Sequence, residues 1–436
     1  MTPASTSLPL PPVQDHATGA KPRTGAGWAG ALLASGLLVL STAVSRGQQP
    51  ILPPVVPPSD LAVQTAIGTG EDIVGNPIAV QPDDLPPAYQ NGSLTLRPHF
   101  LYRLLYGDGI QASPGHKSST FIDTLAPGLF ASIGSHWIVD YTPSWDIYSN
   151  SAFEDTVDQT LNISGNETFD TWTVQFSQSY IKSSQPLVET GVQTNEQDYI
   201  TSLAIAHVLS DRFAVEADLY QYLRYAKGFP DSNNWSDTDW LNYRINSQLI
   251  AGVGVALGFV KDSGQPDATF TNPEVRLTWK PGKKLTLSAD VGSEHREFYG
   301  HPKTGLTSPT FDVYLDYAIF DRTRLKASAG RQISDSYFAG ETTKNTFWNV
   351  SVEQRLLKHW TLSAGFGNDD TDYVATLAET DQVRHDTEIT YNGRLSWTFL
   401  RRGTLALLYN STRDRATVAG YGFTSNQVGL EATYRY

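Results

Sequence analysis

The most constraining feature of this sequence is a two-residue alternation of apolar and polar side chains, which runs from residue 93 to the C-terminus. In the last segment, 428–436, apolar and aromatic residues occupy the even positions, and Gly429, Glu431, Thr433 and Arg435 occupy the odd ones. Successive side chains of a β-strand point to opposite faces, so this alternation predicts strands. The same pattern recurs at 94–104, 137–147, 172–177, 213–220, 285–291, 311–317, 348–353 and 389–397.

The segments that join these strands are alternately short and long. An antiparallel meander with tight turns at one end and long loops at the other is the layout of a membrane barrel. We therefore predict an all-β fold, a transmembrane antiparallel up-and-down β-barrel of about 18 strands (roughly 16–20), with short periplasmic turns and long extracellular loops. The short segments include 134–136, 209–212, 246–248, 280–284, 320–324, 357–359 and 400–403, and the long ones 183–198, 226–239, 300–308 and 368–382.

The last strand is expected to pair with the first, at about 94–106, because an open sheet edge cannot be satisfied in hydrocarbon. Aromatic residues near both strand ends support the barrel, since the two membrane interfaces select such rings. A soluble β-sandwich or solenoid is the alternative, but it gives no reason to place Trp at strand ends. Trp137, Trp172, Phe213, Trp279, Phe320, Trp360 and Trp397 lie beside short turns, and Tyr106, Tyr148, Tyr180, Tyr225, Phe259 and Phe298 lie near long loops.

The first 92 residues lack the alternation. Residues 28–44 form an apolar run that follows Lys21 and Arg23 and ends at small residues, which predicts a signal peptide over 1–45. An uncleaved membrane anchor is the alternative. Residues 46–92 are Pro-rich and lack a period, which predicts a periplasmic linker or tail that could dock a periplasmic partner. The barrel would then comprise residues 93–436.

Composition excludes several kinds of chemistry. The 436 residues include no cysteine, which rules out thiol catalysis, thiolate metal sites and disulfides. A net charge of -13 argues against a nucleic-acid partner. No cofactor or metal site is predicted: the acidic segment 368–373 could hold Ca²⁺ but lacks the EF-hand pattern, so a solvated loop is favoured. His295 and His385 lie near carboxylates and are the candidates for a barrel enzyme, but strand-end histidines are usually solvated, so we predict no enzymatic activity.

The polar face of the strands predicts the lining of a water-filled lumen. Charges of both signs across a pore orient polar solutes and select weakly by sign, and tyrosines offer stacking faces for sugars. The alternative is that these charges pair across strands and hold the barrel together. The candidates are Arg97, His99, Arg103, Asp140, Glu216, Asp218, Tyr220, Tyr222, Arg244, Arg276, Asp290, Asp312, Tyr314, Asp316, Arg324, Glu353, Arg355 and Arg394.

Two resemblances add to this interpretation. Val428, Leu430, Ala432, Tyr434 and Tyr436 resemble the C-terminal signal that the bacterial barrel-assembly machinery reads. Over about 93–436, the chain also resembles a family of β-barrel porins that are often encoded near exopolysaccharide or capsule genes. The segments that carry this second resemblance are 124–151, 154–166, 242–259 and 272–292.

The resemblances imply the outer membrane of a Gram-negative-type bacterium, with its lipid and lipopolysaccharide as surroundings, and a passage for polysaccharide. We therefore predict a porin-like channel for polar solutes, with a role in exopolysaccharide export as a narrower hypothesis. The alternative is a structural or docking barrel with an occluded lumen that binds a periplasmic export partner. The sequence leaves the oligomeric state open.

Overall fold

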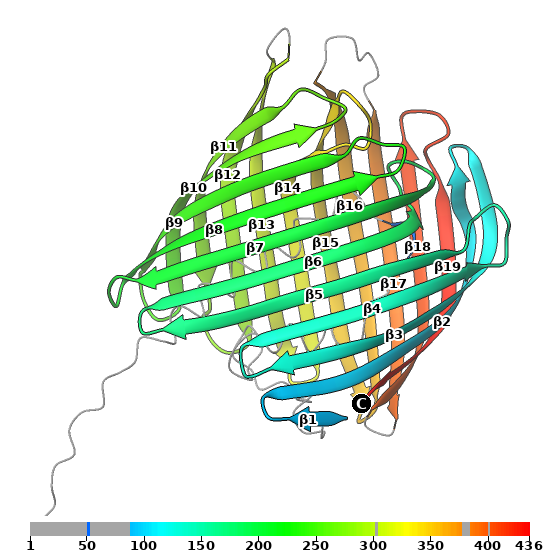
Figure 1. Cartoon of the computed structure of the whole chain (residues 1–436), viewed down its shortest axis with the longest axis horizontal. Coiled ribbons are helices and arrows are strands. Elements are labelled where there is room, and N and C mark those ends of the chain that lie inside the picture. Colours follow the sequence, from blue (N-terminus) through cyan, green and yellow to red (C-terminus); the bar gives the residue numbers. More distant parts are fainter. Residues whose placement is uncertain (1–49, 53–87, 301–303, 377–383, 400–401) are drawn as a thin grey trace, which may run out of the picture.

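A computed structural model describes residues 50–52, 88–300, 304–376, 384–399 and 402–436 (Figure 1). The predicted signal peptide, most of the Pro-rich segment, His301 and parts of the predicted loops 300–308 and 368–382 lie outside the described residues. The strands are β1 (Tyr89–Asn91), β2 (Leu94–Ser113), β3 (His116–Ile133), β4 (Trp137–Tyr148), β5 (Thr156–Phe169), β6 (Trp172–Pro186), β7 (Gln193–Val208), β8 (Phe213–Ala226), β9 (Ser232–Arg244), β10 (Leu249–Asp262), β11 (Ala268–Trp279), β12 (Leu285–Phe298), β13 (Thr304–Phe320), β14 (Thr323–Asp335), β15 (Glu341–Leu357), β16 (Trp360–Ala375), β17 (His385–Phe399), β18 (Gly403–Ala416) and β19 (Thr424–Arg435).

The strands form one closed antiparallel barrel. The sheet has 19 strands, of which β1 is a three-residue addition paired with β2, so the barrel itself comprises the 18 strands β2 to β19. Each strand pairs with the next, and β19 returns to β2, with Leu430 opposite Leu104 and Tyr434 opposite Phe100. The predicted strand number and the predicted closing pair are both confirmed. Among the described residues, no helix is long and apolar enough to cross a membrane.

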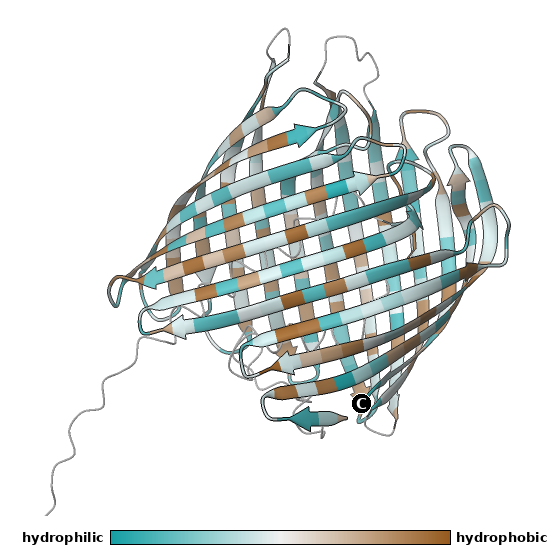
Figure 2. Ribbon diagram, in the orientation of Figure 1, coloured by the Kyte–Doolittle hydropathy of each residue, from teal (hydrophilic) through white to brown (hydrophobic). Residues whose placement is uncertain are grey.

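The two faces of the barrel wall have opposite chemistry, as the alternating colours along each strand in Figure 2 show. On β19 the outward-facing Leu430 is 61% exposed, whereas the inward-facing Glu431 is 3% exposed. The aromatic residues predicted beside the turns all lie on the outer face, with exposed fractions from 37% for Trp360 to 68% for Phe320. Exposed apolar side chains therefore cover the outside of the barrel, and polar side chains fill its interior.

Two aromatic residues expected near the loops lie on the inner face instead. Tyr148 and Phe298 are buried, whereas Tyr106, Tyr225 and Phe259 are exposed on the outside. Proximity to a loop does not decide which face a residue occupies, because parity along the strand does. Tyr148 follows the outward-facing Ile147, so its own side chain must point inward. The expectation for Tyr148 and Phe298 was therefore wrong.

The strands also extend further than the sequence pattern predicts. The segment 183–198 contains a loop of only six residues, 187–192, and in the segment 226–239 only 227–231 are outside strands. The start of β9 is rich in Ser, Asn and Asp, which are poor strand formers, yet it pairs with both neighbours. Strand propensity depends on context, and an established ladder extends through unfavourable residues. We call the end with connections such as 134–136 the turn end, and the end with connections such as 187–192 the loop end.

Candidate functional site: the lumen of the barrel

The structure places the predicted lining residues on the inner face of the wall, but with very different degrees of burial. His99, Arg103, Asp140, Glu216, Asp218, Tyr222, Arg276 and Asp316 are buried. Arg97, Tyr220, Arg244, Asp290, Asp312, Tyr314, Arg324 and Arg394 are partly buried. Glu353 and Arg355 are exposed near the turn end of β15. Three clusters decide what the lumen can do: two include predicted lining residues, and the third is formed by loop residues that were not among the candidates.

The first cluster joins the ends of the barrel, and we call it the closing seam. Its members are Arg103 of β2, Arg394 of β17 and Glu431 of β19. Glu431 Oε2 accepts hydrogen bonds from Arg103 Nη2 at 2.8 Å and from Arg103 Nε at 3.0 Å. Glu431 Oε1 lies 2.8 Å from Arg394 Nη2. Glu431 is not among the predicted lining candidates, although its parity in the last strand places it on the inner face.

A polar pair lies beside the seam. His99 Nε2 of β2 is 3.1 Å from Asp140 Oδ1 of β4, and both side chains are almost fully buried. Thr142 Oγ1 donates to the same carboxylate at 3.2 Å. A Cβ on Gly128 would lie 2.1 Å from the His99 ring, so a glycine at this position leaves room for the imidazole. On this side of the barrel, charges pair across strands, as the structural alternative predicts.

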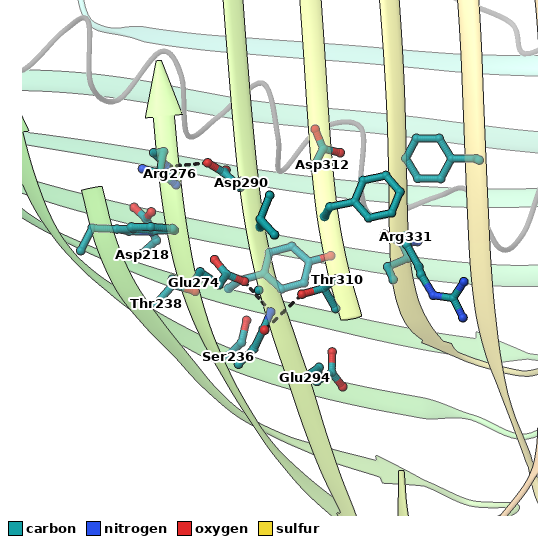
Figure 3. A pocket seen from close by; sticks show the side chains of 18 residues that line it. Asp218, Ser236, Thr238, Glu274, Arg276, Asp290, Glu294, Thr310, Asp312 and Arg331 are labelled. Carbon is teal, nitrogen blue, oxygen red and sulfur yellow. Dashed lines mark hydrogen bonds and ion pairs between the residues drawn. The ribbon is translucent and has the colours of Figure 1, made fainter. Parts of the chain in front are cut away.

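The second cluster lines a cavity of about 210 Å³ in the opposite wall, which we call the acidic pocket (Figure 3). Arg276 of β11 is one of its lining residues: Nε is 3.2 Å from Asp290 Oδ1, and Nη1 is 3.4 Å from Glu216 Oε2. The guanidinium carbon lies 3.8 Å from the centre of the Trp240 ring. Asp218 and Glu274 also interact electrostatically with Arg276, so one guanidinium is surrounded by four carboxyl groups. The pocket therefore carries an excess of acid.

The third cluster narrows the lumen at the loop end, where the β6–β7 loop (187–192) meets the β14–β15 loop (336–340). Glu189 Oε1 accepts hydrogen bonds from Ser336 Oγ at 2.6 Å and from the Tyr337 backbone N–H at 2.8 Å. Between these two hairpins lie six strands one way round the barrel, β8–β13, and eight the other way, β16–β19 with β2–β5. The contact among Glu189, Ser336 and Tyr337, which we call the mouth lock, therefore crosses the lumen.

Buried arginines support the mouth lock. Arg224 of β8 donates to the Ser336 carbonyl at 2.8 Å, and its guanidinium carbon lies 4.0 Å from the centre of the Tyr337 ring. Arg384 donates to the Glu189 carbonyl at 2.8 Å. Burial raises the pKa of the Glu189 carboxyl to about 7, although the bonds from Ser336 and Tyr337 oppose this shift. The β14–β15 loop is thus fixed from several sides of the barrel.

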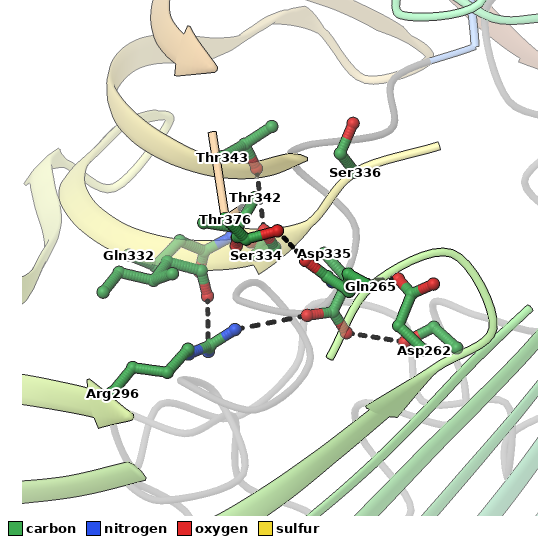
Figure 4. Close-up of polar contacts among 12 residues, drawn as sticks. Asp262, Gln265, Arg296, Gln332, Ser334, Asp335, Ser336, Thr342, Thr343 and Thr376 are labelled. Atoms are coloured by element: carbon green, nitrogen blue, oxygen red, sulfur yellow. Dashed lines mark hydrogen bonds and ion pairs between the residues drawn. The ribbon is translucent and has the colours of Figure 1, made fainter. Parts of the chain in front are cut away.

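The base of the same loop is held by a polar network (Figure 4). Arg296 Nη1 lies 3.2 Å from Asp335 Oδ1, and Ser232 Oγ donates to Asp335 Oδ2 at 2.6 Å. Thr342 Oγ1 donates to the Ser334 carbonyl at 2.8 Å. These contacts link β9, β12, β14 and β15 at the loop end. They fix the direction in which the β14–β15 loop leaves the wall.

A short piece of the Pro-rich segment also lies at the loop end. The Ile51 backbone N–H donates to the Pro186 carbonyl, and Gln427 Nε2 donates to the Ile51 carbonyl, both at 2.9 Å. Ile51 is 1% exposed and Leu52 5% exposed, in an apolar cluster with Tyr148 and other inward-facing residues. The sequence predicts that this segment is a periplasmic linker. The one sequence signal of a bound segment is the apolar pair Ile51 and Leu52, which is flanked by prolines.

The two candidate catalytic histidines lie in contacts typical of solvated residues. His295 Nδ1 is 2.8 Å from Thr307 Oγ1, and His385 Nδ1 is 2.8 Å from Asp372 Oδ1, both on exposed surface. Within the part of the chain that the structure describes, no group of three or more His, Asp or Glu side chains is arranged to hold a metal ion.

The closed 18-strand meander, its apolar outer face and its polar lumen are the architecture of outer-membrane β-barrels. No protein-family model matches the chain, and no curated protein matches it significantly. Among solved structures, OpdL of Pseudomonas aeruginosa matches 79% of this chain and 99% of its own, at 10% identity and a TM-score of 0.42. OccK7 (OpdD) of the same organism matches 80% and 99%, at 9% identity and a TM-score of 0.44. OccAB4 of Acinetobacter baumannii matches 78% and 98%, at 10% identity and a TM-score of 0.42.

Proposed function

We propose that this protein is an outer-membrane channel for small polar solutes. The observation that carries the proposal is the inversion of ordinary protein chemistry, with exposed apolar side chains outside the barrel and charged side chains within it. Only lipid satisfies such an outer face, and a closed barrel leaves no unpaired strand edge in the membrane. Outer-membrane lipid and lipopolysaccharide would surround the wall, and the barrel-assembly machinery would insert it.

The charge of the lumen favours cations. Five carboxyl groups and two guanidinium groups line the acidic pocket: Asp218, Glu274, Asp290, Glu294 and Asp312 against Arg276 and Arg331. A lining with an excess of one sign of charge raises the local concentration of the opposite ion. A porin of this kind would pass neutral and cationic solutes more readily than anions. The closing seam has the opposite excess, two guanidinium groups to one carboxylate, and offsets part of this preference.

Planar-bilayer recording of the purified protein tests the proposal. We expect discrete ohmic steps, and a reversal potential shifted toward cation selectivity under a KCl gradient. Membrane fractionation should place the protein in the outer membrane, and the unheated protein should migrate fast on a detergent gel because a closed barrel resists SDS. A folded barrel without conductance would contradict the channel function, and recovery as a soluble protein would contradict the membrane location.

Exopolysaccharide export is a narrower version of this proposal. Its support is the resemblance of segments such as 124–151 and 242–259 to porins encoded near capsule genes. A polymer would need the mouth lock to open, because the lock crosses the lumen. Secretion of polymer by cells that lack the protein, compared with cells that carry it, tests this version, and unchanged secretion would contradict it.

The segment Pro50–Leu52 favours a second candidate, a docking barrel whose lumen is occluded. Its apolar side chains fill a cluster at the loop end, and a periplasmic partner that bound the Pro-rich segment would compete with this contact. An Ile51→Asp variant separates the two candidates, with Ile51→Val as the matched control. If only Ile51→Asp conducts, the lumen of the native barrel is occluded. If native protein and both variants conduct equally, the segment does not obstruct the channel.

A further inference from the structure

The outer face of β9 carries two carboxyl groups among apolar side chains. Trp240 lines the acidic pocket on the inner face, and successive side chains of a strand point to opposite faces. Asp237 and Asp239 therefore point outward, and Asp239 is exposed. The cross-strand partners of Asp237 are Leu219 of β8, which is 43% exposed, and Leu257 of β10, which is 51% exposed. The two aspartates thus interrupt an apolar surface.

Their position along the strand places these aspartates within the hydrocarbon layer. On the outer face of β9, Trp235 lies toward the loop end and Tyr243 toward the turn end, and such rings mark the two membrane interfaces. The eight residues from one ring to the other span about 26 Å along the strand, or about 20 Å across the membrane after a tilt of about 40°. Asp237 and Asp239 lie between the rings. Lipid alone is an unfavourable environment for a charged group at this depth.

Polar side chains extend this region over the three preceding strands of the wall. Thr201 Oγ1 of β7 donates to Gln178 Oε1 of β6 at 2.7 Å and lies 3.2 Å from Gln221 Oε1 of β8. Gln221 is opposite the outward-facing Trp235 in the ladder, so this row of side chains also faces outward. We call the following residues the outer polar patch: Gln178, Thr201, Gln221, Asp237 and Asp239.

The patch is complementary to a second copy of itself. In a two-fold contact both copies present the same surface, so the donors of the patch must meet its own acceptors. The Gln221 amide donates, the Asp237 carboxyl accepts, and the two residues lie on neighbouring strands, two positions apart in the ladder. A two-fold axis between β8 and β9 places Gln221 of each copy opposite Asp237 of the other. Lipid tails offer neither a donor nor an acceptor.

We propose that the outer polar patch is the contact surface between two copies of this barrel. Amide–carboxyl hydrogen bonds would be exchanged at its centre, and the apolar side chains around them, such as Leu219 and Leu257, would shield them from lipid. Polar side chains act in the same way between other membrane-spanning segments. The inference rests on the membrane location in the proposed function, because water would satisfy these groups without a partner, and it does not depend on conduction.

Cysteine cross-linking in the native membrane tests this contact. The chain contains no cysteine, so one introduced thiol reports on one position. Leu219→Cys lies beside the proposed axis, and Leu430→Cys, on the outer face of β19, is the matched control. Under a mild membrane-permeant oxidant we expect a covalent dimer from Leu219→Cys and none from Leu430→Cys. Equal cross-linking of both variants, or of neither, would overturn the proposal.

A second pair of variants tests the hydrogen bonds. Asp237→Leu removes the acceptor and suits lipid, so we expect the dimer dissociation constant in detergent to rise at least about tenfold, the effect of losing charge-assisted hydrogen bonds. Asp237→Asn keeps an acceptor and should remain dimeric. Light scattering measures the mass, and fast migration on an unheated gel shows that each variant has folded. If Asp237→Leu dimerises as the native protein does, the patch is not the contact.

The failures of the two proposals are distinguishable. A protein that conducts in bilayers but gives no specific cross-link at Leu219→Cys remains a channel and loses this contact. A protein that forms the dimer through Asp237 but does not conduct keeps the contact and loses the channel function.

Discussion

The closing seam and the acidic pocket are both clusters of buried charges in one lumen, yet their charge ratios are opposite. In the seam, two guanidinium groups surround the single carboxylate of Glu431. In the pocket, four carboxyl groups surround the single guanidinium of Arg276. The seam joins strands from the two ends of the barrel, and every oxygen of its carboxylate is bonded. The pocket joins neighbouring parts of one wall, and its carboxyl groups share the guanidinium of Arg276. The same residue types thus build a closed structural contact in one place and line an acid-rich cavity in the other.

The largest effect is expected from Glu431→Gln. The substitution removes the carboxylate that accepts two hydrogen bonds from the buried guanidinium of Arg103, and breaking a buried ion pair costs about 3 kcal/mol. The temperature at which the unheated gel band loses its fast mobility should fall clearly. The double variant Glu431→Gln with Arg103→Met removes both charges and should recover most of the loss. An unchanged transition in Glu431→Gln would show that the seam does not hold the barrel.

The next effect concerns the end of the same strand. Deletion of residues 434–436 removes the pairing of Tyr434 with Phe100 and the 3.0 Å bond from the Tyr436 N–H to the Pro98 carbonyl. We expect the fraction of assembled barrel in the outer membrane to fall severalfold without a loss of export, and Tyr436→Ser to have a smaller effect of the same kind. Thr433→Ser, on the wet inner face, is the control and should be nearly silent. Normal assembly of the truncated chain would contradict the assembly-signal interpretation.

Asp218→Asn should behave in the opposite way to Glu431→Gln. It replaces one of several carboxyl groups around Arg276 and leaves the ion pairs of Arg276 with Glu216 and Asp290 in place, so we expect stability to change by less than about 0.5 kcal/mol. The reversal potential under a KCl gradient, recorded at alkaline pH where the carboxyl groups are ionised, should move toward zero, because the lining loses negative charge. A destabilisation as large as that of Glu431→Gln would show that the pocket is a structural cluster like the seam.

The smallest effect is expected at the mouth lock, where pH sets the charge of Glu189. Burial raises the pKa of this carboxyl from 4.5 to about 7, against opposing contributions from Arg224, Arg384, Ser336 and Tyr337. The native state therefore holds the proton more tightly than the unfolded chain does, so the contribution of Glu189 to stability is fully present below about pH 4.5 and is lost as the pH rises to about 7. Conductance should accordingly be modestly lower at pH 5 than at pH 8.

Glu189→Gln is the matched variant for this prediction. The amide keeps the carbonyl that accepts from Ser336 and Tyr337 but does not titrate, so its conductance should remain at the low value from pH 5 to pH 8. A native protein whose conductance does not change over this range, or a variant that still responds to pH, would show that Glu189 does not control the mouth.

The sequence by itself determined the strands, their faces and the closure of the barrel. Alternation is a local property, and once one face of the barrel must meet lipid, it fixes the direction of every side chain. Tyr148 illustrates this: its parity along the strand predicts the inner face where the structure places it, whereas its proximity to a loop suggested the outer face. It also assigned the Trp residues to the turn end, where Trp137, Trp172 and Trp360 each begin a strand on the outer face.

Only the tertiary structure decided which inner-face residues meet. Arg103 and Glu431 are 328 residues apart, and the register of β19 against β2 places them side by side. Glu189 and Ser336 come from opposite sides of the wall, and Ile51 comes from a segment without any period. A period of two tells each side chain which way to point, but it carries no information about barrel register or about loops that turn inward. Those depend on contacts between distant parts of the chain, and for that reason the clusters in the lumen appeared only once the barrel was closed.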